Sequence, residues 1–213
     1  MDSKFFITIG RQLGAGGLEI AGKLSKIFDI PVYDKELLNI ASKESGIATE
    51  IFENADETPR KVKGGFFGIG ISGVGYNDYF GVNALDESEL FRIQSDVIRN
   101  IAAERSAIFV GRCADYILRD EPRCMSVFIT ANNSDRIARL RLSKRFDGLK
   151  ELSDQQVIDY MKKEDKKRAG YYNYYTYKEW GHSHSYNLCL DSSFYGTDVC
   201  TEIIAKLAKE KLS

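Results

Sequence analysis

The sequence predicts an α/β fold with a mostly parallel β-sheet flanked by helices. Short apolar runs alternate along the chain with segments that have the apolar spacing of helices. The first of these runs leads through a glycine-rich turn directly into an amphipathic segment. Parallel strands need long crossover connections, which the intervening helices would provide. Strand and helix in alternation therefore favour a parallel sheet over an antiparallel one.

Five runs rich in β-branched and aromatic residues are expected to be strands buried on both faces. They cover residues 5–10, 30–33, 107–111, 125–130 and 186–191. Helical spacing is found in six further segments, at residues 18–28, 35–43, 86–104, 135–146, 154–168 and 198–212. A chain of 213 residues is long enough to bury one sizeable core. We therefore expect a single domain.

Two stretches fit this alternation poorly and are expected to be inserts. Residues 64–81, within the stretch 44–85, hold seven glycines and five aromatic residues. They are expected to form a flexible loop. The alternative is a flap or a surface for self-association, which would make the protein a homodimer. Residues 131–170 carry eleven Lys and Arg against seven Asp and Glu. This surplus predicts either a solvated helical face or a lid that closes over a polyanion.

Composition excludes several classes of function. The formal net charge of −1 makes the whole chain a poor match for nucleic acid or an anionic membrane. No apolar run reaches 18 residues and no export signal begins the chain, so a cytoplasmic protein is expected. The four cysteines are widely spaced, which argues against a disulfide framework. His182, His184 and Cys189 match no common zinc spacing, so no metal site is expected.

The glycine-rich turn in "ITIGRQLGAGGLEIAGKL", residues 7–24, has the layout of a phosphate-binding loop. Glycines let successive backbone N–H groups converge on an anion, and the following helix adds a favourable dipole. The usual loop then continues with Lys and Ser or Thr, but this chain has Gly17 and Leu18. A turn that packs helix on sheet without a ligand therefore remains the alternative.

Arginines follow two of the later strands. Arg112 comes directly after the strand at 107–111, at the end where open α/β sheets bind ligands. Arg136 and Arg139 are three residues apart and share one helix face, while Arg141 and Arg145 share another. Guanidinium groups can hold phosphate at two points. The pattern therefore favours phosphate binding over a glycine turn without a ligand.

With these motifs the sequence resembles the cytidylate kinase-like family, a divergent branch of the P-loop nucleoside monophosphate kinases. The resemblance covers nearly the whole chain, and it is carried by "ITIGRQLGAGGLEIAGKL", "IPVYDKELL", "IFVGRCADYIL", "VFITANNSDRIARL", "EDKKRAGYYNYYT" and "WGHSHSYNLCLDSS". It implies a P-loop NTPase fold with a five-stranded parallel sheet. Its parts would be a core (1–43, 86–130 and 186–213), a monophosphate-binding insert (about 44–85) and a lid (about 131–180).

The resemblance also implies roles for individual residues. Arg112 falls on the arginine that binds the acceptor phosphate, with Cys113 where the family has aspartate. Asp34 is what remains here of the family's Asp-Thr-Gly segment. The lid arginines correspond to Arg136 and Arg139, and the late Asp-x-x-Arg to Asp165 and Arg168. Met161-Lys162 stands where those kinases have Arg-Asp, so cytosine selectivity is the least supported part.

The expected function is ATP-dependent phosphoryl transfer to a nucleoside monophosphate, cytidylate-like, or a similar small phosphorylated acceptor. A nucleotide-binding sensor without turnover is the alternative. ATP and Mg²⁺ are the expected cofactors, with the ion held largely by phosphates and water. Small nucleotides are the expected partners, without nucleic acid or membrane. The expected site residues are Arg11, Arg136 and Arg139 for catalysis, Gly14, Ala15, Gly16, Gly17 and Leu18 for the ATP phosphates, and Asp34, Arg112, Asp165 and Arg168 for the acceptor.

Overall fold

A computed structural model of the chain describes residues 4–34 and 83–212. Residues 1–35 and 98–213 form one compact unit, and residues 36–97 form a second. Only residues 83–97 of the second unit are described. The helix expected at 35–43 and nearly all of the insert expected at 44–85 therefore lie outside the described residues.

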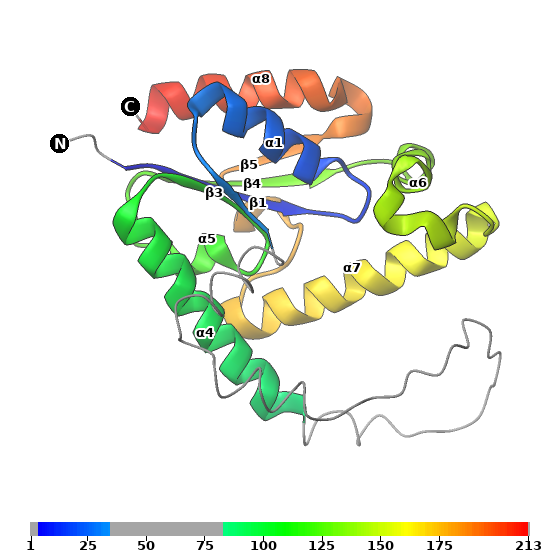
Figure 1. Cartoon of the computed structure of the whole chain (residues 1–213), viewed down its shortest axis with the longest axis horizontal. Helices are drawn as coiled ribbons and strands as arrows, with labels where there is room; N and C mark the ends of the chain where they lie inside the picture. Colours follow the sequence, from blue (N-terminus) through cyan, green and yellow to red (C-terminus); the bar gives the residue numbers. More distant parts are fainter. Residues whose placement is uncertain (1–3, 35–82, 213) are drawn as a thin grey trace. The chain divides into compact units, whose positions relative to one another are not determined.

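The sheet has five parallel strands, as the sequence predicts (Figure 1). They are β1 (Phe6–Arg11), β2 (Val32–Tyr33), β3 (Ala107–Val110), β4 (Cys124–Thr130) and β5 (Leu188–Asp191). Their order across the sheet is β2-β3-β1-β4-β5. Strand β1 lies in the middle, with Ile9 paired to Val110 on one side and to Val127 on the other. The loop after β1 therefore leaves from the centre of the sheet's carboxyl edge, where open α/β sheets bind ligands.

Helices cover both faces of the sheet (Figure 1). Helices α1 (Gly17–Phe28) and α8 (Ser192–Leu212) lie side by side on one face. The opposite face carries α5 (Ala114–Ile117) and α7 (Asp154–Thr176). Helix α4 (Asn83–Glu104) joins the first unit at residue 98. Within the described residues, 4–34 and 83–212, no helix is long and apolar enough to cross a membrane.

The core lies between the sheet and the pair α1 and α8. Fully buried aliphatic side chains meet there from all three elements, among them Ile7 and Ile9 of β1, Ile20 and Leu24 of α1, and Ile204 of α8. Each such side chain stabilises the fold by about 1.5–3 kcal/mol relative to its exposed state. The glycine-rich loop is thus attached at both ends to well-packed elements.

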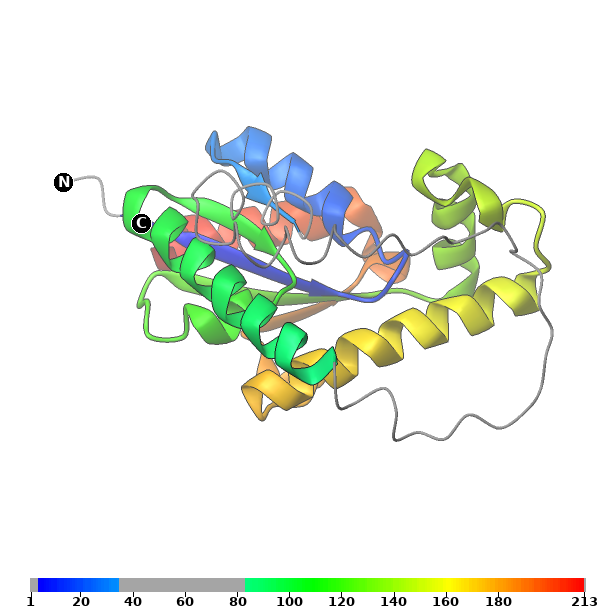
Figure 2. The same cartoon turned by 60° about the horizontal axis from the view of Figure 1, so that its bottom comes forward.

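A second apolar cluster lies in the region that the sequence predicts as a lid. Helix α6 (Asn133–Leu142), the 3₁₀ turn η1 (Lys144–Leu149) and α7 contribute Ile137, Leu140, Leu149, Val157 and Met161. Figure 2 shows α6 and η1 beside one end of α7. Leu13 of the glycine-rich loop packs into the same cluster. The lid region therefore contacts the loop directly.

Helix boundaries differ from the sequence expectation in three places. The helix expected at 135–146 ends at Leu142, and η1 follows. Helix α7 begins as expected, with a capping box between Ser153 and Gln156, but it continues to Thr176. Helix α8 starts at Ser192, with a break in the helical backbone at Gly196 (φ 77°). The four-residue helix α5 was not expected at all.

Candidate functional site at the glycine-rich loop

The loop between β1 and α1 has the backbone of a phosphate cradle. Gly14 and Gly16 have φ angles of 77° and 81°, which favour glycine. A Cβ on Gly14 would also lie 2.8 Å from the carbonyl oxygen of Arg136. The N-cap residue of α1 is Gly16, which provides no side-chain hydrogen bond to the first turn. The unpaired N–H groups of a helix's first turn form a natural binding site for an anion.

Two charged side chains hold the outer side of this loop. The Leu13 N–H donates to Oδ1 of Asp165 (2.8 Å), and the Leu13 carbonyl accepts from Nε of Arg136 (2.6 Å). Arg136 and Asp165 also form an ion pair with each other, and their side chains are only 6% and 13% exposed. We call Arg136 and Asp165 the loop bracket. It ties the loop to α6 and α7.

Arg139 and Ser192 hold the next two residues of the loop. Arg139 donates to the Gly14 carbonyl (3.3 Å) and to Oγ of Ser192 (3.1 Å). The Ser192 hydroxyl in turn donates to the Ala15 carbonyl (2.8 Å). Arg136 and Arg139 therefore orient the loop's carbonyl groups in this structure. Their catalytic role stays a prediction, and the contacts seen here are positioning contacts.

Arg11 occupies the space next to Gly17, where the usual lysine side chain would begin. A Cβ on Gly17 would lie 2.8 Å from Cβ and 2.9 Å from Cγ of Arg11. The same side chain ends against Gly111, whose added Cβ would meet Nη1 of Arg11. Gly17 and Gly111 are therefore small because Arg11 runs between them. This pairing explains why the lysine position of the loop carries glycine.

Arginines from three other segments surround Arg11. Burial, and after it the charges of Arg168, Arg112 and Arg145, lower the pKa of Arg11 to about 9, whereas Asp34 opposes the shift. Burial also lowers the pKa of Arg168. Arg11 stays a cation at neutral pH, but its neighbours repel it. Such an excess of positive charge favours binding of an anion.

The acceptor residues expected from the sequence take different positions. Arg112 has a left-handed backbone (φ 57°), and its guanidinium carbon lies 5.3 Å from the ring centre of Tyr171. Asp34 and Arg168 lie near enough to Arg11 to affect its charge. Asp165 instead belongs to the loop bracket. The structure therefore brings the charges of Asp34, Arg112 and Arg168 near Arg11. Asp165 contacts Arg168 (3.5 Å) as well as the loop, and its acceptor-binding role stays a prediction.

Asp115, in the short helix α5, is hydrogen-bonded to an aromatic side chain. Its Oδ2 accepts a hydrogen bond of 2.7 Å from the Tyr172 hydroxyl. Burial raises the pKa of Asp115, and the hydrogen bond from Tyr172 opposes this shift. Because the bond fixes its carboxylate within the fold, Asp115 fits a structural role better than a contact with substrate.

Sequence reasoning missed two residues of this site. Arg145 lies in η1, and the break in the expected helix brings its charge to Arg11. The sequence predicts Arg145 on one helix face with Arg141 without giving it a role in the site, and the basic surplus of residues 131–170 is a second signal for it. Ser192 is a buried serine at the start of α8, and no sequence pattern marked it. Both act through contacts between segments far apart in the sequence.

A cavity among the described residues lies elsewhere. It has a volume of about 430 Å³ and is lined by residues including Lys4, Phe6 and Arg99. Phe6 begins β1, so this cavity is at the opposite end of that strand from the glycine-rich loop. This cavity is therefore separate from the candidate site at the loop.

Comparison with known proteins agrees with this geometry. A crystal structure of an uncharacterized protein from Eubacterium ventriosum is similar, with a TM-score of 0.69 and 27% identity over 97% of this chain and 99% of the other. Shikimate kinase from Bacteroides thetaiotaomicron shares the fold, with a TM-score of 0.55 and 13% identity over 96% of this chain and 98% of the other. No curated protein matches the sequence.

Both neighbours share the fold of a parallel sheet flanked by helices. The cytidylate kinase-like family matches residues 6–194, which include the loop, the bracket and the arginines around Arg11. A match of this length extends over most of the 213 residues. The chain therefore belongs to the cytidylate kinase-like family.

Proposed function

We propose that the protein is an ATP-dependent kinase that transfers a phosphoryl group to a nucleoside monophosphate, cytidylate-like, or to a similar small phosphorylated acceptor. One observation carries the proposal. The uncapped first turn of α1 lies beside Arg11, around which Arg112, Arg145 and Arg168 are gathered. Backbone N–H groups and several guanidinium groups at one place suit a polyphosphate.

Arg11 supplies the positive charge that a lysine provides in the usual loop. The aliphatic part of its side chain crosses Gly17 and its guanidinium group ends at Gly111, so the cation stands beside the loop, at the carboxyl end of β3, although residue 17 has no side chain. Phosphoryl transfer depends mainly on positioning and on charge around the transferring group. A guanidinium group meets that need as well as an ammonium group does.

Arg112 and Arg168 hold the acceptor phosphate in this proposal. They come from the segment after β3 and from α7, so they approach Arg11 from two separate elements. Each can form two hydrogen bonds with a phosphate group. Tyr171 lies against the guanidinium of Arg112 and limits where it can point. The acceptor would thus be oriented before the reaction.

The position where the usual loop coordinates Mg²⁺ offers few protein ligands for the ion. Leu18 stands where the usual loop has a hydroxyl, and it is 48% exposed and offers no side-chain oxygen. Asp165 already contacts Leu13, Arg136 and Arg168. Asp34 is the carboxylate near Arg11 that could accept a hydrogen bond from bound water. The residues at Leu18 therefore do not fit direct coordination, and the ion would depend on phosphates and water.

The test is ADP release from ATP across a panel of nucleoside monophosphates, with Arg11→Gln and Arg112→Ala as variants. Arg11→Gln should lower kcat by roughly 10² to 10³, as loss of a charge-stabilising donor does. Arg112→Ala should raise the acceptor KM. Arg119→Gln is the matched control, because Arg119 is an exposed arginine that pairs with Asp120. A wild-type rate shared by Arg11→Gln and Arg119→Gln would refute the role of Arg11.

A sensor without turnover is the second candidate function, and Leu18 at the hydroxyl position favours it. Both functions predict ATP binding, and they differ in whether a phosphoryl group is transferred. The sensor would bind ATP with the same dependence on Arg11 but form no diphosphate with any acceptor of the panel. Absence of ATP binding at millimolar concentration would contradict both.

A further inference from the structure

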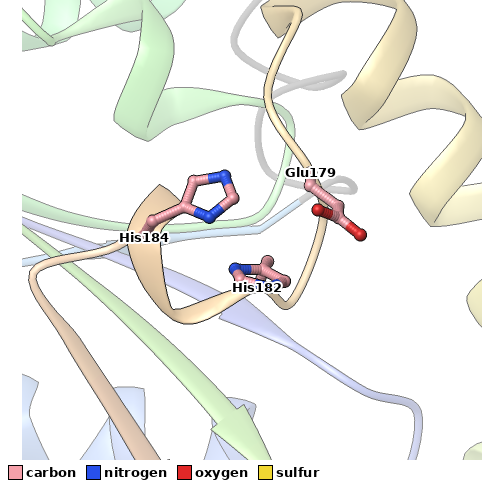
Figure 3. A group of neighbouring side chains, drawn as sticks. All are labelled: Glu179, His182 and His184. Carbon is pink, nitrogen blue, oxygen red and sulfur yellow. The ribbon is translucent and has the colours of Figure 1, made fainter.

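Both histidines of the chain lie together on the segment that joins α7 to β5. Figure 3 shows His182 and His184 on one turn with Glu179. Each of the three side chains offers one metal-ligating atom, and these atoms all lie within 4.8 Å of one another. All three side chains are exposed. They are on a different segment from every residue of the proposed kinase site.

The backbone of this turn is held by hydrogen bonds at several points. The Trp180 N–H donates to Oδ1 of Asn173 (2.8 Å), and the His182 N–H donates to the Glu179 carbonyl (3.3 Å). The Trp180 ring packs edge-on against Phe128 of β4, with 5.1 Å between ring centres. The turn is therefore attached to the sheet, while its histidine and glutamate side chains are exposed and the two imidazole rings lie 4.2 Å apart, centre to centre.

We propose that Glu179, His182 and His184 bind a divalent transition-metal ion of the zinc type. Two imidazole nitrogens and one carboxylate oxygen form a donor set that zinc uses with water in the remaining position. Ligand atoms in such a site stand about 3.4 Å apart, given bonds of about 2.1 Å. Binding would therefore require the exposed side chains to bring their ligand atoms closer than the present limit of 4.8 Å.

The donor set also determines which ions are rejected. Mg²⁺ and Ca²⁺ select oxygen ligands, and this site offers one carboxylate among two imidazoles. Millimolar Mg²⁺, which the proposed kinase reaction requires, would therefore not compete for it. Zn²⁺ should bind in the presence of Mg²⁺, and Cu²⁺ should bind still more tightly.

Sequence reasoning considered the two histidines with Cys189 and expected no metal site. The structure combines them instead with Glu179, which follows the end of α7. Cys189 lies in β5 and is not part of the group. Glu179 and His184 meet because a turn and the short helix η2 (Ser183–Ser185) fold the chain back between them. Spacing along the sequence does not show such a reversal.

The test uses the full-length chain without an affinity tag and without nucleotide. Zn²⁺ is titrated by calorimetry in the presence of millimolar Mg²⁺, and the imidazole signals are followed by ¹⁵N NMR. Because the chain has two histidines, its spectrum contains two imidazoles, and both should shift with one equivalent of Zn²⁺. His182→Gln and His184→Gln should each weaken binding at least about tenfold. Glu179→Gln should weaken it as well.

Two further measurements make the assignment specific. Trp180 is the chain's single tryptophan and adjoins Glu179, so one equivalent of Cu²⁺ should quench its fluorescence in the wild type and not in His184→Gln. Cys189→Ser is the control, since Cys189 is an exposed free thiol close in sequence. Unchanged Zn²⁺ binding in that variant supports the proposal. Loss of binding in Cys189→Ser, or wild-type binding in both histidine variants, would overturn it.

Discussion

The loop bracket gives the sharpest test of what holds the glycine-rich loop. Asp165→Asn removes the negative charge beside Arg136 while keeping an oxygen that can accept from the Leu13 N–H. The Arg136 side chain is 6% exposed, so it cannot recover its hydration when the charge is lost. Breaking a buried ion pair on one side costs about 3–5 kcal/mol. Asn retains one bond, so we expect about 3 kcal/mol.

Urea unfolding measures this loss directly. With a slope of about 2–3 kcal/mol/M for a chain of this size, the midpoint should fall by about 1–1.5 M. The matched control is Glu164→Gln on the same helix, one residue away. Glu164 pairs with Lys167 over 2.6 Å, but those side chains are 27% and 62% exposed. An exposed pair of this kind contributes only about 0.3–0.5 kcal/mol.

The outcome of the pair of variants is decisive. A large fall in the urea midpoint for Asp165→Asn, with a negligible one for Glu164→Gln, would confirm that the loop bracket is buried and stabilises the loop. Equal small shifts would refute the reasoning, because they would mean that water reaches Arg136 in the folded protein. The wild type and both variants should have the same unfolding slope, since none of these changes alters the surface exposed on unfolding.

Two more predictions concern pH and the glycine at position 17. Burial raises the pKa of Asp115 above its ordinary 3.8, so the folded protein binds this proton more tightly than the unfolded chain and loses stability as pH rises through the raised pKa. Asp115→Asn should remove that loss, and its stability relative to wild type should improve between pH 4 and pH 7 in urea unfolding; a constant difference would contradict the burial. Gly17→Ala places a Cβ 2.8 Å from Cβ of Arg11 and should cost about 1–3 kcal/mol in stability. The control is Gly22→Ala in the same helix, where nothing lies within 4 Å, so it should stabilise the protein by about 0.5–1 kcal/mol in the same thermal or urea assay. Equal effects of these two alanines would show that Arg11 does not cover Gly17.

The strands and the glycine-rich turn could be predicted because their signals are local. Each buried strand is a short apolar run, and the left-handed backbone at Gly14 and Gly16 is reflected in the residue type itself. All five expected strands appear, and the parallel arrangement follows from the helices between them. The helix ends were less predictable. The helical backbone breaks at Gly196 and ends at Leu142, but the apolar spacing of the sequence shows no change at either position.

The sequence by itself determined the parallel sheet, the loop and the supply of arginines, because burial and backbone conformation act through neighbouring residues. Only the tertiary structure determined which partner each charged side chain contacts. It placed Arg136 against Asp165, Arg11 over Gly17, and the two histidines with Glu179. These pairings join segments that are distant in sequence or reversed by a turn. Electrostatic attraction and steric exclusion depend on separation in space, which residue order does not specify.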